Sequence, residues 1–125
     1  MKIGFIGCGN MGSALARAVC SLGEHEVLVS DYLKEKAEAF AKECGASAAD
    51  NAEITESCDI VFLAIKPNLY PEVLPTLTPY LAKNQGAVVV SIAAGVKIER
   101  VKALLTEKTK VIRIMPNTPV AYGEG

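Results

Sequence analysis

Three closely spaced glycines, Gly7, Gly9 and Gly12, constrain the fold of this chain more than any other feature of its sequence. They follow an apolar run at Lys2–Gly7 and open a segment of helical periodicity at Asn10–Leu22, so they connect a strand to a helix. In that context the first glycine allows a tight turn, the second lets a pyrophosphate approach the backbone, and the third lets the helix pack closely on the strand. The N–H groups at the start of the helix then face the anion. The pattern predicts a dinucleotide-binding loop, and the alternative is a glycine-rich turn without a ligand.

Strands and helices are expected to alternate along the rest of the chain. The expected strands cover Lys2–Gly7, Glu26–Ser30, Asp59–Ile65, Ala87–Ile92 and Val111–Met115, with a weak one at Ala46–Ala48. The expected helices cover Asn10–Leu22, Leu33–Cys44, Leu69–Ala82 and Lys97–Thr106, with a short one at Ala52–Ser57. The strands are apolar on both faces, which is typical of parallel strands buried between two layers of helices. The expected fold is therefore α/β, with a Rossmann-type doubly wound, mainly parallel sheet and helices on both faces.

Asp31 ends the second expected strand, where an acidic side chain accepts hydrogen bonds from the adenosine ribose hydroxyls of a dinucleotide. A carboxylate at this place attracts the 2′-hydroxyl of NADH and repels the 2′-phosphate of NADPH. We therefore expect NAD(P)H as the cofactor, with a preference for NADH. Lys34 opposes this preference because its side chain could swing toward a phosphate. Asp31 is also suited to capping the helix that begins near Leu33, and the two roles are compatible.

Three further loops begin where expected strands end. They contain Ala64–Asn68, Ser91–Gly95 and Met115–Pro119. In a doubly wound sheet, ligands bind at the carboxyl ends of the strands beside the topological switch point, which is expected here between the first and fourth strands. These loops are therefore expected to face the cofactor. Ordinary loop functions are the alternative: Pro67 can start a helix, and Asn51 can cap one.

The composition excludes several kinds of partner. The 125 residues give room for one domain, and their 13 basic and 14 acidic residues form no run that would bind nucleic acid. No apolar stretch is long enough to cross a bilayer, so we expect a cytosolic protein without a membrane partner. The 4 cysteines form no Cys-x-x-Cys pair and the chain has 1 histidine, so we expect reduced thiols and no metal site.

Four blocks of the sequence together resemble the pyrroline-5-carboxylate reductase family. They are Ile3–Gly12, Ala64–Pro67, Val90–Val96 and Met115–Pro119. The first block is common to many dehydrogenases, whereas the other three are specific in this order and spacing. The resemblance implies the last step of proline biosynthesis, in which NAD(P)H reduces the C=N bond of a small imine, 1-pyrroline-5-carboxylate, to give L-proline.

The resemblance also implies which residues contact the cofactor. It adds Asn51, whose side-chain amide is expected to reach the adenosine ribose. Lys66 is the only ionisable residue of the three later loops and is expected to hold its position near the cofactor, and no catalytic residue is assigned. With the glycine pattern, the expected cofactor-binding residues are Ile6, Gly7, Cys8, Gly9, Asn10, Met11, Gly12, Asp31, Asn51, Ala64, Ile65, Lys66, Pro67, Ile92, Ala93 and Ala94.

Residues 1–125 are expected to form one NAD(P)-binding domain without the C-terminal helical lobe of the resembled family. That lobe forms the dimer and supplies substrate-binding groups. The resemblance therefore implies a homo-oligomer for the longer protein, and cofactor binding without turnover for these residues alone. Two alternatives stay open. One is another NAD(P)-dependent dehydrogenase, of the 3-hydroxyacid or 6-phosphogluconate type, and the other is a non-catalytic dinucleotide-binding module.

Overall fold

A computed structural model describes residues 1–93 and 95–114, and only the backbone at Asn10. Its strands are β1 (Lys2–Ile6), β2 (Glu26–Ser30), β3 (Ser47–Ala48), β4 (Ile60–Leu63), β5 (Val88–Ser91) and β6 (Lys110–Arg113). Its helices are α1 (Asn10–Leu22), α2 (Lys34–Cys44), α3 (Asn51–Ser57), α4 (Tyr70–Ala82) and α5 (Ile98–Leu104), with a short 3-10 helix η1 (Pro67–Leu69) before α4. These elements agree with the expected alternation to within a few residues.

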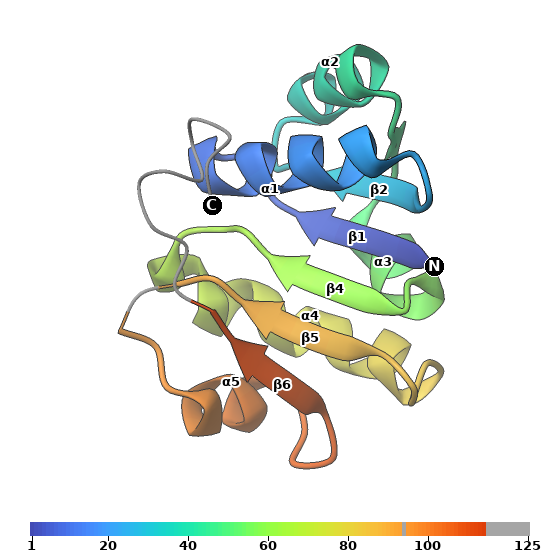
Figure 1. Cartoon of the computed structure of the whole chain (residues 1–125). Coiled ribbons are helices and arrows are strands. Elements are labelled where there is room, and N and C mark those ends of the chain that lie inside the picture. Colours follow the sequence, from blue (N-terminus) through green and yellow to red (C-terminus); the bar gives the residue numbers. More distant parts are fainter. Residues whose placement is uncertain (94, 115–125) are drawn as a thin grey trace.

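The six strands form one parallel sheet in the order β3-β2-β1-β4-β5-β6. The arrowheads of the longer strands point to one edge, and α1 starts at that edge and runs back across the sheet (Figure 1). The chain reverses its direction of winding between β1 and β4, which is the topological switch point. The predicted Rossmann-type fold and the predicted switch point are both confirmed.

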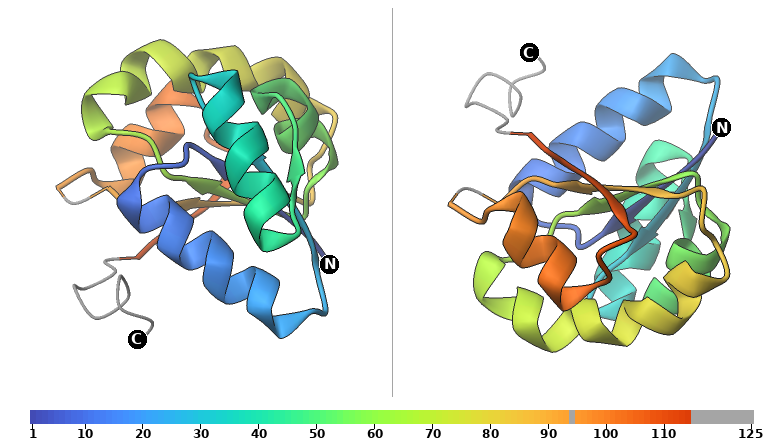
Figure 2. Two further views of the ribbon diagram at one scale, coloured as in Figure 1. Left: turned by 90° about the horizontal axis from the view of Figure 1, so that it is seen from above. Right: turned by 90° about the horizontal axis from the view of Figure 1, so that it is seen from below.

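Helices cover the sheet from both sides, as the two views in Figure 2 show. On one side, α1 and α2 bury Ala16, Ala37 and Phe40 against the sheet. On the other side, α3 and α4 bury larger side chains, among them Ile54 and Leu74, which are 0% exposed. Burying apolar side chains on both faces of the central strands is what drives such a sheet to form.

The strands are buried as their apolar sequences predict. Phe5 of β1 and Phe62 of β4 lie directly opposite each other in the register, and their rings stack with centroids 4.6 Å apart. Such aromatic pairs stabilise a sheet beyond the area that they bury. This pair lies beside the switch point, so it helps to hold the two strands between which the candidate site opens.

Two details differ from the expected local structure. Asp50, rather than Asn51, caps α3, and its carboxylate accepts a hydrogen bond of 2.7 Å from the Glu53 N–H. The alternative in which Asn51 is the cap is therefore wrong, because the acid one residue earlier takes that place. The last strand was expected to reach Met115, which lies outside the described residues.

No helix in the described part of the chain is both long and apolar enough to cross a membrane.

Candidate cofactor-binding site

The glycine loop that is expected to bind the pyrophosphate, here called the phosphate loop, joins β1 to α1 at the carboxyl edge of the sheet. Gly7 has a φ of 104°, a backbone conformation that favours glycine, and a Cβ there would lie 2.7 Å from the Ala64 carbonyl oxygen. At Gly12 a Cβ would lie 2.5 Å from the Ala64 Cβ, so this glycine allows α1 to pack closely on the end of β4. The structural roles predicted for the first and third glycines are confirmed.

Gly9 differs from the other two glycines of the loop. It is the N-cap of α1, and the nearest atom to a Cβ built there is the Ala64 carbonyl oxygen at 3.9 Å. The first intrahelical hydrogen bond runs from the Ser13 N–H to the Gly9 carbonyl, at 2.8 Å. Helix geometry therefore directs the preceding N–H groups out of the helix end, where they can bind an anion. Among the described residues only the Ala64 carbonyl oxygen lies within 4 Å of a Cβ at Gly9, which leaves room for an anion there.

Asp31 connects the phosphate loop to the segment after β2. One carboxylate oxygen accepts a hydrogen bond of 2.9 Å from the Cys8 N–H, and the other accepts one of 3.1 Å from the Leu33 N–H. Each carboxylate oxygen can accept a further hydrogen bond. The two backbone contacts fix the carboxylate at the carboxyl edge with capacity left for a hydroxyl donor. The N-cap position of α2 itself is taken by Leu33, which has no side-chain capping bond.

Asn51 is brought close to the end of β2 by a side-chain hydrogen bond. The buried Ser30 hydroxyl donates to its Oδ1 atom, with 2.5 Å between the two oxygens. Because its oxygen is occupied by Ser30, the amide nitrogen is the group oriented for another partner. Asp31 directly follows Ser30 in the chain, so two residues distant in sequence, Asp31 and Asn51, are brought together.

A groove of about 1010 Å³ opens beside these side chains. Five of the expected site residues line it, namely Ile6, Gly7, Asp31, Asn51 and Ile65. Its other walls come from α2, from the end of β3, from the start of α3 and from one side of α4 along most of its length. The remaining lining residues are Ser30, Tyr32, Lys34, Ala37, Glu38, Ala48, Ala49, Asp50, Ala52, Leu69, Glu72, Val73, Thr76, Leu77 and Tyr80.

Comparisons with known proteins identify the family of this chain and several similar enzymes. The family described as NADP oxidoreductase, coenzyme F420-dependent, matches residues 2–95. The chain belongs to this family. It is also 39% identical to the pyrroline-5-carboxylate reductase of Escherichia coli (strain K12) over 128 residues, which cover 99% of this chain and 47% of the relative. The chain therefore spans about half the length of the curated relatives that it matches.

Similar solved structures include other pyrroline-5-carboxylate reductases. A pyrroline-5-carboxylate reductase from Coxiella burnetii matches with a TM-score of 0.88 at 29% identity, over 96% of this chain and 45% of that one. The pyrroline carboxylate reductase of Plasmodium falciparum, solved with NADP bound, matches with a TM-score of 0.83 at 29% identity, over 100% of this chain and 45% of that one. The predicted resemblance to pyrroline-5-carboxylate reductases is confirmed over the whole chain.

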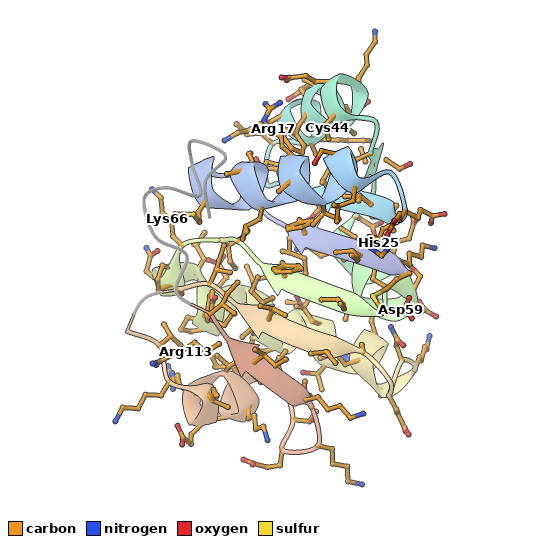
Figure 3. The ribbon with its side chains drawn as sticks, in the orientation of Figure 1. Arg17, His25, Cys44, Asp59, Lys66 and Arg113 are labelled. Carbon is orange, nitrogen blue, oxygen red and sulfur yellow. The ribbon has the colours of Figure 1, made fainter. Side chains whose placement is uncertain are left out.

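The other expected site residues that the structure describes do not line the groove. Cys8 is buried, its thiol donates to the Ser30 carbonyl at 3.4 Å, and burial raises the pKa of the thiol to about 11. This member of the NADP oxidoreductase family therefore presents a protonated thiol there at neutral pH. Lys66 and Pro67 are exposed, Ala93 is buried in the core, and Figure 3 shows Lys66 beside the carboxyl edge. Ala94 and Met115–Pro119 lie outside the described residues.

Sequence reasoning missed the walls that α4 and β3 contribute. Leu69, at the end of η1, and Val73 and Thr76 of α4 recur at helical spacing and line the groove. That spacing is visible in the sequence, but it also fits a helix face that packs on the core. Ala48 is the last residue of β3 and Ala49 follows it, and a strand of only two residues is only weakly marked in the sequence.

A buried pair of hydroxyl groups lies near the carboxyl edge of the sheet. The Tyr70 hydroxyl lies 2.9 Å from the Ser91 hydroxyl oxygen, and burial raises the pKa of Tyr70. This buried contact connects α4 to the end of β5.

Within residues 1–93 and 95–114, no group of three or more His, Cys, Asp or Glu side chains could hold a metal ion.

Proposed function

We propose that this chain is the cofactor-binding part of a pyrroline-5-carboxylate reductase, which reduces 1-pyrroline-5-carboxylate to L-proline with NAD(P)H. The observation that carries the proposal is the meeting of the phosphate loop with Asp31 and Asn51 at one groove, in a chain that resembles enzymes of this name along its whole length. Residues 1–125 are then the NAD(P)-binding domain. We propose that a helical lobe of the longer protein supplies substrate contacts and forms a homo-oligomer.

The cofactor-binding residues that we propose are those expected from the sequence. The N–H groups at the start of α1 hold the pyrophosphate, Asp31 and Asn51 hold the adenosine ribose, and Ile6 and Ile65 provide apolar contacts. The loops after β4 and β5 then face the nicotinamide half. The further members of the proposed set are Gly7, Cys8, Gly9, Asn10, Met11, Gly12, Ala64, Lys66, Pro67, Ile92, Ala93 and Ala94.

The proposed reaction makes modest demands on this part of the enzyme. NAD(P)H supplies a hydride to the carbon of the C=N bond when it is bound. A protonated imine is already an electrophile, so the protein contributes chiefly by aligning the reactants and excluding water. Lys66 is exposed at the carboxyl edge, and we assign it to positioning rather than to proton transfer.

An activity assay on the longest natural form of the protein tests the proposed reaction. We expect it to oxidise NAD(P)H when 1-pyrroline-5-carboxylate is added, and to form proline in equal amount. A 3-hydroxyacid with oxidised cofactor serves as the comparison. Turnover of the 3-hydroxyacid alone would favour the other dehydrogenase class, and cofactor binding without turnover of either substrate would favour a non-catalytic module.

We further propose that the cofactor is NADH in preference to NADPH. The groove is lined by four carboxylates, Asp31, Glu38, Asp50 and Glu72, against one ammonium group, that of Lys34. A 2′-phosphate entering this region meets mostly negative charge, whereas a 2′-hydroxyl can donate to Asp31. The matching family is described as an NADP oxidoreductase and the Plasmodium falciparum enzyme was solved with NADP bound, so a preference for NADH here would be a sharp test of the local electrostatics.

Binding of both cofactors to the wild type and to Asp31→Ser measures this preference. Two charges about 4 Å apart repel by roughly 4 kcal/mol at an effective dielectric of about 20, and solvent at the exposed rim reduces this. We expect the wild type to bind NADH about 5- to 150-fold more tightly than NADPH, which corresponds to about 1–3 kcal/mol. Asp31→Ser should remove most of the difference, mainly by improving the binding of NADPH. Equal affinities in the wild type, or an unchanged ratio in the variant, would contradict the assignment.

A further inference from the structure

Two cysteines that take no part in the proposed site lie in contact between α1 and α2. The Sγ atoms of Cys20 and Cys44 are 3.4 Å apart and form a hydrogen bond, although the residues are 24 positions apart in the chain. Both side chains are partly exposed, whereas Cys8 and Cys58 are buried. The four thiols of the chain therefore fall into a reachable pair and two enclosed single residues.

Neighbouring contacts hold the two helices in this register. One turn before Cys20, the Arg17 guanidinium donates to the Glu43 carboxylate at 2.7 Å, and it also lies 4.9 Å from the centre of the Phe40 ring. Arg17 and Cys44 accordingly lie side by side between α1 and α2 (Figure 3). The approach of the two sulfur atoms follows from the packing of two complementary helix faces.

The helix ends leave room for the sulfur atoms to come closer. Cys44 is the last residue of α2, and Cys20 lies in the last turn of α1. Gly23 and Gly45 follow the two helices in left-handed conformations, and a Cβ built on either would meet no atom within 4 Å. A disulfide needs the sulfur atoms at about 2.05 Å. The open space at the two glycines lets the last turns of the helices shift, since helix ends fray readily.

We propose that Cys20 and Cys44 are a site of reversible oxidation, at which hydrogen peroxide converts the two thiols into an intramolecular disulfide. One thiolate attacks a peroxide oxygen and breaks the O–O bond, which gives a sulfenic acid and hydroxide. The other thiolate attacks the sulfenic sulfur and displaces its hydroxyl group. Both hydroxides leave as water with the two thiol protons, so two thiols and one peroxide give one disulfide and two waters.

The environment of the pair makes this reaction slow at neutral pH. Burial, and then contact with the Cys44 thiol, raise the pKa of Cys20 to about 11. Since the thiolate is the reactive form, the rate of oxidation should rise by up to about tenfold per pH unit below that pKa. The site therefore responds to sustained oxidation rather than to brief exposure.

The new bond would connect α1 to α2 at their carboxyl ends. Cys20 is ten residues along α1 from its start, which places it about 15 Å from the phosphate loop at 1.5 Å per residue. The disulfide would restrict the unfolded chain between residues 20 and 44 and so stabilise the fold. This inference does not depend on the proposed function.

Peroxide treatment of the reduced chain at pH 8, followed by mass spectrometry without reductant, tests the proposal. We expect a monomer lighter by two hydrogens, a peptide pair connected through Cys20 and Cys44, and a fall from four free thiols to two. The midpoint of thermal unfolding should rise by roughly 5–15 °C. Dithiothreitol should reverse all these changes.

Cys20→Ser and Cys44→Ser are the matched controls. Each keeps a small polar side chain at the contact, so each should fold as the reduced wild type does and form no intramolecular disulfide. Separate sulfinic or sulfonic acids at Cys20 and Cys44, disulfides between chains as the main product, or four free thiols after prolonged treatment would each overturn the proposal.

Discussion

Gly9→Val is expected to weaken dinucleotide binding by roughly a hundredfold or more, which is about 2.7 kcal/mol or more, while the chain keeps its fold. A side chain at this position points into the open space over the start of α1, and the nearest protein atom is 3.9 Å from its Cβ. That atom is the Ala64 carbonyl oxygen, at an ordinary van der Waals distance, so the side chain fits the fold but fills the volume through which a pyrophosphate reaches the helix end. Titration of both chains with NADH, with circular dichroism to monitor folding, measures the effect.

Gly86→Val is the control for this experiment. A Cβ at Gly86 also meets no atom within 4 Å, but Gly86 lies in the turn before β5, and it does not line the groove. We expect this variant to bind NADH as the wild type does. A folded Gly9→Val variant with wild-type affinity would mean that the pyrophosphate binds elsewhere.

The second large effect is the loss of catalysis in the isolated chain. We expect these 125 residues to bind the dinucleotide and to give no measurable reduction of 1-pyrroline-5-carboxylate, because the chain spans only about half the length of the relatives that it resembles. Cofactor alignment alone does not position the imine or exclude water from it. The comparison is made between this chain and the longest natural form at equal molar concentration, with proline formation as the readout.

The activities of the two forms and their affinities for NADH together test the predicted loss of catalysis. The longer form should be active where the 125-residue chain is not, and both should bind NADH with similar affinity. Turnover by the isolated chain at a rate near that of the longer form would contradict the division of labour between the two parts.

The fold could be predicted almost completely from local signals. The glycine pattern of Gly7, Gly9 and Gly12 fixes one strand–turn–helix unit, and apolar runs such as Ile60–Leu63 mark buried parallel strands. Right-handed crossovers then leave few ways to order the strands. The least regular element, β3, has two exposed residues and no apolar alternation, so its extent was the least predictable.

The candidate site was only partly predictable because its geometry depends on contacts between distant segments. Asp31 was identified from its place after β2, but its hydrogen bonds to the Cys8 and Leu33 N–H groups became visible only in the structure. For Asn51 the residue pattern alone indicates only a possible helix cap, a role that Asp50 takes, and its expected contact with the ribose comes from the family resemblance. Its contact with Ser30 joins residues 21 positions apart. No local pattern reports such a contact.

The residues near the start of α4 show a second reason why the site could not be fully predicted from the sequence. Leu69 and Val73 line the groove, whereas the neighbouring Leu74 is fully buried in the core. All three are apolar residues at or near the first turns of α4, so their type alone does not separate the side chains that face the groove from those that face the sheet.

The central claim, that a dinucleotide binds where the phosphate loop meets Asp31 and Asn51, is tested most directly by an NMR titration of the isotope-labelled chain with NADH. At 13.2 kDa the chain is small enough for each backbone amide to be followed separately. We predict saturable shifts concentrated at residues 6–12, at Asp31 and at Asn51, with little change at the opposite ends of α1 and α2. Absence of saturable shifts at millimolar NADH, or shifts centred on another face of the sheet, would contradict the account.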